Sequence, residues 1–212
     1  PMMQSLFPIL GIFAVFSPAL MLPGPDFVAV VRNTVARGTR VGVLTAVGVS
    51  IGITFYAALS ALGLAALTSR IEWFEVVVRA GGSLFLGYLG IRLLLTRSPV
   101  RHIEEETPRV PAGPRNPVLL GLLINLTNPK AIVFFASIFG TAIKPGTPTP
   151  VIGLLVAVIG VCAMIWFSAV SLLTASTGML VRLEDHQHWI ERLAGLAFLG
   201  FSAKIIYDLL LA

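Results

Sequence analysis

The sequence predicts an all-α membrane protein with six transmembrane helices, arranged as two inverted repeats of three helices with helices one and four broken. Hydrophobic residues make up 56% of the 212 residues and charged residues only 12%, about half the charged share of a soluble domain. Apolar blocks alternate with short polar stretches, and the one long polar stretch divides them into two groups of three. We therefore expect a single transmembrane domain over 1–212, with repeat one at 1–96, a linker at 97–116 and repeat two at 117–212.

Each apolar block approaches the length of a spanning helix, which is about 20 residues. The stretch at 97–116 instead contains four prolines, an acidic triplet and four arginines, which is typical of a loop. The run to Leu22 lacks the basic start of a signal peptide and is expected to be the first helix. The six blocks run approximately over 5–22, 41–67, 74–95, 118–143, 151–176 and 189–211.

Basic residues predict the orientation, because Lys and Arg accumulate in cytoplasmic loops. The loops after the first, third and fifth blocks hold nine arginines, and the opposite side holds three basic residues. We therefore expect the first set of loops in the cytoplasm and both termini outside. The nine are Arg32, Arg37, Arg40, Arg97, Arg101, Arg109, Arg115, Arg182 and Arg192, and the three are Arg70, Arg79 and Lys144.

The division into halves of three spans indicates a transporter. Because three is odd, a second copy of the same unit enters the membrane upside down. Inverted repeats of this kind are a recurring plan among transporters, with the solute site at the interface between the repeats, near the membrane midplane.

A helix break is predicted at Pro23, Gly24, Pro25 and Asp26. Pro25 suits the first turn of a short new helix over 27–36, and Gly24 is expected to supply an unwound backbone. Asp26 then lies in that first turn, where the helix dipole favours an anion. It is either a capping acid at the membrane boundary or an acid that binds a proton or a substrate ammonium group.

Asn128, Pro129 and Lys130 interrupt the fourth block in a similar way. Asn followed by Pro is typical of an N-cap and a first helical position, so a half-helix should start here inside the membrane. Lys130 lies far from both ends of its block, and a charge at that depth should face a cavity or a partner. These residues favour a carboxylate-binding site over a lysine that extends to the membrane boundary.

Three more polar residues lie near the two breaks. Arg32 is either an anchor at the cytoplasmic boundary or part of the entrance to a solute site, and Asn33 follows it on the same short helix. Asn125 lies one turn before the second break. It either hydrogen-bonds a solute or bridges two helices.

Other classes of function have little support. The net charge of +5 fits cytoplasmic loops better than a nucleic-acid surface, which needs a clustered basic face. Cys162 is the one cysteine, so a disulfide within the chain and a cysteine-based metal cluster are excluded. His102, His186 and His188 fall in predicted loops. No catalytic set, phosphate loop or zinc motif is present, so we predict neither an enzyme nor a cofactor or metal site.

The chain resembles the lysine exporter (LysE) superfamily, in its homoserine and threonine efflux (RhtB) branch. The resemblance covers most of the chain and is carried by PGPDFVAVVRNTVARGTRVGVLTAVGVSIG (23–52), GGSLFLGYLGIRLL (81–94) and GLLINLTNPKAIVFFASIF (121–139). It implies a bacterial inner-membrane exporter of amino acids or close derivatives, driven by the proton gradient. The family's signature residues match at Pro23, Gly24, Pro25, Asp26, Asn128, Pro129 and Lys130.

We therefore expect export of a zwitterionic amino acid by alternating access. Lys130 and the start of the half-helix would bind the carboxylate, and Asp26 would bind the ammonium group or exchange it for a proton. The alternative is export of a divalent cation or another small metabolite, which the wider superfamily also includes. Hard cations require several carboxylates, and Asp26 is the only acid well placed for one.

Small residues spaced four apart predict close helix packing. Gly48 with Gly52 and Ser83 with Gly87 form such pairs. They fit packing within the chain and a homodimer equally well. The other expected partners are an amino-acid substrate, protons and the lipid bilayer, without nucleic acid.

Overall fold

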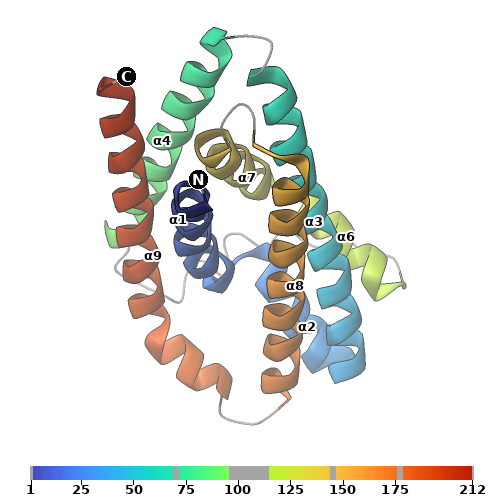
Figure 1. Cartoon of the computed structure of the whole chain (residues 1–212). Helices are drawn as coiled ribbons and strands as arrows, with labels where there is room; N and C mark the ends of the chain where they lie inside the picture. Colours follow the sequence, from blue (N-terminus) through green and yellow to red (C-terminus); the bar gives the residue numbers. More distant parts are fainter. Residues whose placement is uncertain (1, 69–71, 96–114, 144–146, 176–178, 212) are drawn as a thin grey trace.

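The computed structural model describes residues 2–68, 72–95, 115–143, 147–175 and 179–211, and within these ranges every regular element is a helix. Figure 1 shows α4 and α9 on one flank and α3 and α8 on the other, with α1 and α7 between them. The predicted linker lies outside the described residues except for its last two. The helices are α1 (Met2–Met21), α2 (Pro25–Arg37), α3 (Thr39–Thr68), α4 (Glu72–Leu95), α6 (Pro117–Leu126), α7 (Pro129–Ala142), α8 (Thr149–Thr174) and α9 (Met179–Leu210).

Four helices are long and apolar enough to cross a membrane, within α3, α4, α8 and α9. The pair α1 and α2 forms a fifth span if it is taken as one helix, bent by 44° between Met21 and Pro25. The fourth predicted block instead forms α6 and α7, and at 1.5 Å per residue neither alone crosses a hydrocarbon core of roughly 30 Å. The helical membrane fold is confirmed, while six spans in two inverted repeats stay a prediction.

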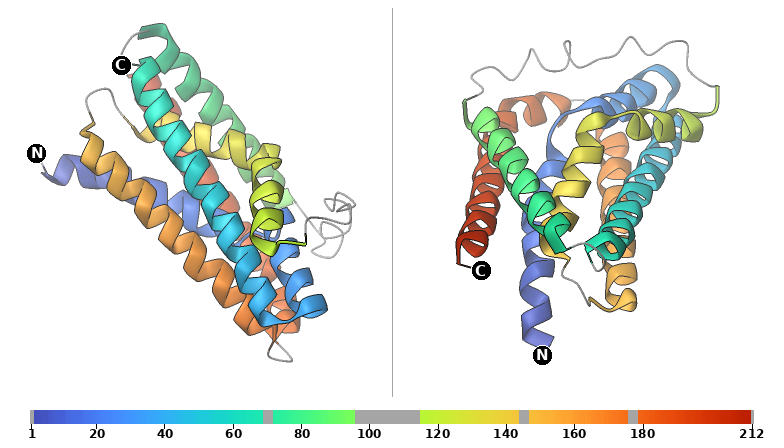
Figure 2. Two further views of the ribbon diagram at one scale, coloured as in Figure 1. Left: turned by 90° about the vertical axis from the view of Figure 1, so that its right-hand side faces the viewer. Right: turned by 90° about the horizontal axis from the view of Figure 1, so that it is seen from above.

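Figure 2 shows the start of α1 and the end of α9 at one end of the molecule, and α2, the start of α6 and the start of α9 at the other. This arrangement agrees with the expectation that both termini lie on the same side of the membrane. Arg32, Arg37, Arg40 and Arg115 are exposed and belong to the end opposite the termini, where the sequence places the cytoplasm.

Both helix starts predicted from proline are confirmed. α2 begins at Pro25 and α7 at Pro129, positions at which the missing amide hydrogen of proline removes no helical hydrogen bond. Asn128 directly precedes α7, and its carbonyl oxygen accepts a hydrogen bond from the Ala131 amide at 3.1 Å. The chain therefore breaks twice, each time at the end of an apolar helix.

Gly24 lies in the unwound backbone of the first break, but its conformation does not require glycine. Its backbone is extended, with φ −157° and ψ −172°, a conformation that other residues also adopt, and an added Cβ would meet nothing within 4 Å. Glycine is required instead at Gly38, whose φ is 91°. Gly38 ends α2 and its amide donates to the Thr34 carbonyl oxygen at 2.9 Å.

The start of α9 also differs from the prediction. The helix begins at Met179 rather than near Trp189, so Arg182, His186 and His188 lie on a helix and not in a loop. No proline or glycine occurs between Met179 and Trp189, and the intervening residues tolerate a helix well. Hydropathy therefore identified where α9 enters the apolar region and not where the helix starts. His102 lies outside the described residues.

Glycines bring α3 and α6 into backbone contact. A Cβ on Gly48 would lie 1.9 Å from the Val118 carbonyl oxygen, and one on Gly121 would lie 2.2 Å from the Thr45 carbonyl oxygen. Backbone atoms cannot rotate away as side chains do, so a larger residue would have to separate the helices. Gly48 thus packs within the chain, which leaves the homodimer untested.

Replacing Gly48 with alanine should destabilise the protein by about 1–3 kcal/mol, because the new methyl group overlaps the α6 backbone. Gly63 is the control on the same helix, since a Cβ there meets nothing within 4 Å. Gly63→Ala should be neutral or stabilising by up to about 1 kcal/mol, because alanine favours a helix. Thermal unfolding of the purified protein in detergent measures both, and equal stability of the two variants would contradict the close approach of α3 and α6.

Candidate functional site

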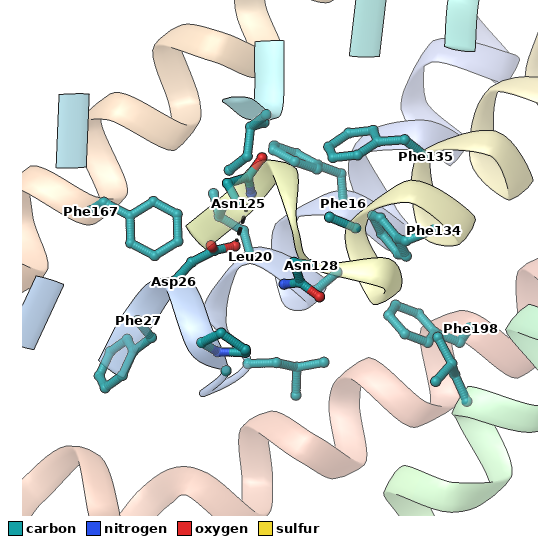
Figure 3. Close-up of a pocket in the computed structure, with 17 residues that line it drawn as sticks. Phe16, Leu20, Asp26, Phe27, Asn125, Asn128, Phe134, Phe135, Phe167 and Phe198 are labelled. Atoms are coloured by element: carbon teal, nitrogen blue, oxygen red, sulfur yellow. Dashed lines mark hydrogen bonds between the residues drawn. The ribbon is translucent and has the colours of Figure 1, made fainter. Parts of the chain in front are cut away.

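The two helix breaks meet at a pocket of about 90 Å³, which has room for on the order of six water molecules. It is lined by the end of α1, the start of α2, the end of α6 and the start of α7, and by single residues of α3, α4, α8 and α9. Among the described lining residues, the side chains able to hydrogen-bond are Asp26, Asn125 and Asn128 (Figure 3). The pocket is therefore mostly apolar, with a small polar region at the breaks.

Asp26 is held in place by a residue from the other half of the chain. The Asn125 Nδ2 group donates to Asp26 Oδ2 at 3.0 Å, which joins the last turn of α6 to the first turn of α2. The position of Asp26 is favourable for a carboxylate, since the free amides at the start of a helix attract negative charge. Asn125 thus bridges two helices, one of the two roles that the sequence left open.

Asn125 is enclosed on all sides, with 0% of its surface exposed. Its Oδ1 has no hydrogen-bond partner and points at α3, because a Cβ on Gly52 would lie 2.5 Å from it. The close packing of α3 against α6 therefore holds the amide group in place, and the Asp26 carboxylate favours the orientation in which the donor end faces it. A carbonyl oxygen turned towards that carboxylate would be repelled instead.

The open end of α6 is supported by α3. The last carbonyl groups of a helix have no partner within it, and in an apolar setting each needs another donor. The Tyr56 hydroxyl of α3 donates to the Leu126 carbonyl oxygen at 2.5 Å. This bond stabilises the second break directly beside the pocket.

The other end of α2 is tied to α8 and α3. The Thr34 and Ser171 hydroxyl oxygens lie 2.9 Å apart, and the Ser171 hydroxyl also donates to the Thr39 carbonyl oxygen at 3.1 Å. Both side chains are buried. The helix that carries Asp26 is consequently held at both of its ends.

The predicted site residues fall into three groups. Gly24, Pro25, Asp26, Asn125 and Asn128 come together at the pocket. Three others do not line it: Pro23 lies between α1 and α2, Arg32 is exposed, and Asn33 donates to the Ala29 carbonyl oxygen of its own helix at 3.0 Å. Pro129 and Lys130 are the first residues of α7, and their side chains lie outside the described part of the structure.

The aromatic part of the pocket was not predicted from the sequence. Phe134 and Phe135 share one face of α7 with Asn128 and Ala131 and line the pocket with them. Their spacing from Asn128 is that of successive helical turns, so extending the face of the broken helix would have identified them. Phe16, Phe27, Phe167 and Phe198 come from four other helices, and no local signal connects them.

A metal site has no ligand set in the described residues. They contain no group of three or more His, Cys, Asp and Glu side chains that could hold an ion. Asp26 is the one acid among the described residues of the pocket. A divalent cation, which takes six to eight oxygen ligands in the case of calcium, would thus find one carboxylate there.

The fold and the pocket define a multi-pass membrane protein with a small cavity at two helix breaks, an arrangement typical of membrane translocators. The family described as LysE type translocator matches residues 18–209, and the chain belongs to this family. It is therefore a translocator and not an enzyme. No solved structure matches the chain significantly.

Similar proteins occur in several bacteria. The threonine efflux protein of Escherichia coli is 31% identical over 189 residues, which cover 89% of this chain and 92% of that protein. The leucine efflux protein of Klebsiella pneumoniae is 30% identical over 195 residues, with 88% of each chain covered. A membrane protein of Haemophilus influenzae is 30% identical over 203 residues, covering 94% and 96%.

Replacing Asn125 with alanine should reduce the free energy of unfolding by about 1.5–3 kcal/mol, because it removes a hydrogen bond to a charged group. Asn33→Ala is the matched control, since the Asn33 amide bonds only within its own turn of α2, and its effect should stay within about 0.5 kcal/mol. Unfolding titrations in detergent micelles compare the two variants. If the two variants lost similar free energies of unfolding, the Asn125–Asp26 bond would add no particular stability.

Proposed function

We propose that this chain exports amino acids or close derivatives across the bacterial inner membrane by alternating access, coupled to protons. The observation that carries the proposal is the pocket at the two breaks, where Asn125 holds the Asp26 carboxylate inside an otherwise apolar cavity. Relatives of similar length are named threonine and leucine efflux proteins, which supports an amino acid as the solute.

The polar region of the pocket suits the two charges of a zwitterion. Asp26 is an anion that would bind the ammonium group. The start of α7 lies across the break, and helix starts bind anions through their free amides. Asn128 lines the pocket at that point, so the carboxylate would lie against α7, with Lys130 supplying the opposite charge.

Proton coupling would follow from competition at Asp26. An ammonium group and a proton both require the same carboxylate, so binding of one displaces the other. A site that exchanges them while it changes sides moves amino acid and proton in opposite directions. Asp26 is joined to α6 through Asn125, so loss of its charge would weaken the contact between the two halves of the chain.

The helix breaks provide the parts that would move. α1 and α2 are separate helices at an angle of 44°, and α6 and α7 are separated by Thr127 and Asn128. In transporters with such broken helices, one repeat or bundle largely rocks against the other around the fixed site to give alternating access.

Asp26→Asn should abolish amino-acid transport driven by a pH gradient in reconstituted vesicles, because an amide can neither release a proton nor neutralise an ammonium group. Counterflow without a gradient separates the two roles left open for Asp26. If Asp26 binds the ammonium group, the Asp26→Asn variant loses both counterflow and gradient-driven transport. If Asp26 only carries protons, the variant keeps counterflow. Full gradient-driven transport by the variant would refute the proposal.

Lys130→Gln should raise the KM for amino acids by about 10- to 100-fold, the effect of losing a hydrogen bond to a charged group. Lys204→Gln is the matched control, because Lys204 is exposed and pairs with Asp208 at 2.7 Å on the surface of α9, an interaction that contributes little. Initial rates of counterflow give both KM values. An unchanged KM in Lys130→Gln would remove this residue from the carboxylate site.

A further inference from the structure

The pocket has a polar side and extensive apolar walls (Figure 3). Asp26 and Asn125 lie together, and Asn128 lies between them and a group of aromatic rings. On the opposite side of Asp26 lies Phe167, which is also apolar. A side chain that extends from a zwitterion at the polar groups towards the aromatic rings or towards Phe167 therefore meets hydrocarbon.

The aromatic group, here called the phenylalanine wall, consists of Phe16, Phe134, Phe135 and Phe198. Its rings follow one another with centroids 5.6–6.2 Å apart, in the order Phe16, Phe135, Phe134, Phe198, which is within the range of favourable ring contacts. All four are buried, and they come from α1, α7 and α9. The wall is therefore a continuous surface fixed by three helices.

A hydroxyl group against this wall would lose its hydrogen bonds to water. Among the described lining residues, the hydrogen-bonding side chains are Asp26, Asn125 and Asn128. In the proposed function Asp26 binds the ammonium group, and Asn128 lies where the carboxylate would bind. Asn125 is further committed to Asp26. A polar group buried without a partner is costly, whereas a methyl group in the same place gains by leaving water.

From this asymmetry we infer that the exporter selects amino acids with an apolar side chain and discriminates against hydroxylated ones. The inference rests on the proposed function, since it concerns the side chain of a zwitterion bound at Asp26. It differs from the activity in the name of the relative from Escherichia coli, which is threonine efflux. Valine and threonine distinguish apolar selectivity from threonine export. Their side chains have the same shape, and valine carries a methyl group where threonine carries a hydroxyl.

The test is counterflow in reconstituted vesicles with labelled valine and labelled threonine, followed by mutation of the wall. Wild-type protein should transport valine with a kcat/KM about 10- to 100-fold above that for threonine, the range that an apolar pocket achieves against an isosteric hydroxyl. Phe134→Tyr, which adds a hydroxyl group at the wall, should narrow this ratio. Phe134→Leu, which keeps the wall apolar, should preserve it, and the exposed Phe55→Tyr on α3 is the control for adding a tyrosine elsewhere.

The outcomes distinguish this inference from the proposed function. Threonine transport equal to or faster than valine transport, lost in Asp26→Asn, would overturn the apolar selectivity and leave the exporter intact. A valine preference unchanged in a folded Phe134→Tyr protein would overturn the role of the wall. Failure to transport any amino acid by correctly inserted protein would overturn the proposed function and this inference together.

Discussion

The structure depends on a constraint that a membrane places on a broken helix. Backbone groups released at a break find no partner among lipid tails, so other parts of the protein or water in a cavity must bind them. α3 meets this need at the second break through Tyr56, whose hydroxyl binds the Leu126 carbonyl oxygen. It can do so because Gly48 and Gly121 allow α3 and α6 to approach to backbone contact. Close packing is thus a condition for the break, and the break is a condition for the pocket.

The same packing organises the polar groups of the pocket. Gly52 leaves just enough space for the Asn125 side chain, whose oxygen faces α3 and whose nitrogen faces Asp26. The pocket consequently presents a carboxylate in a fixed position, although most of its lining is hydrocarbon. Asp26 is half-buried beside Asn125 and Phe167, and an ionisable group in such a place in a membrane protein is a candidate functional residue.

Local features were predictable from the sequence and contacts between distant segments were not. The starts of α2 and α7 follow from Pro25 and Pro129, because proline acts on its own turn of helix. The start of α9 at Met179 was missed because hydropathy reports the medium around a helix and not its hydrogen bonds. The Asp26–Asn125 bond joins residues 99 positions apart. The phenylalanine wall, from Phe16 to Phe198, forms only when the helices pack together. The polar residues at the two helix breaks were therefore predicted, and the phenylalanine residues that line the rest of the pocket were not.

The ties at the two ends of α2 have a mechanical consequence. Thirteen residues span about 20 Å as a helix, so α2 is a short rigid rod. One end meets Asn125 in the pocket, and the other meets the buried Ser171 of α8 through Thr34. A displacement of α8 at Ser171 would therefore shift α2 and the Asp26 carboxylate with it, and a shift of the carboxylate would reach α8 by the same route.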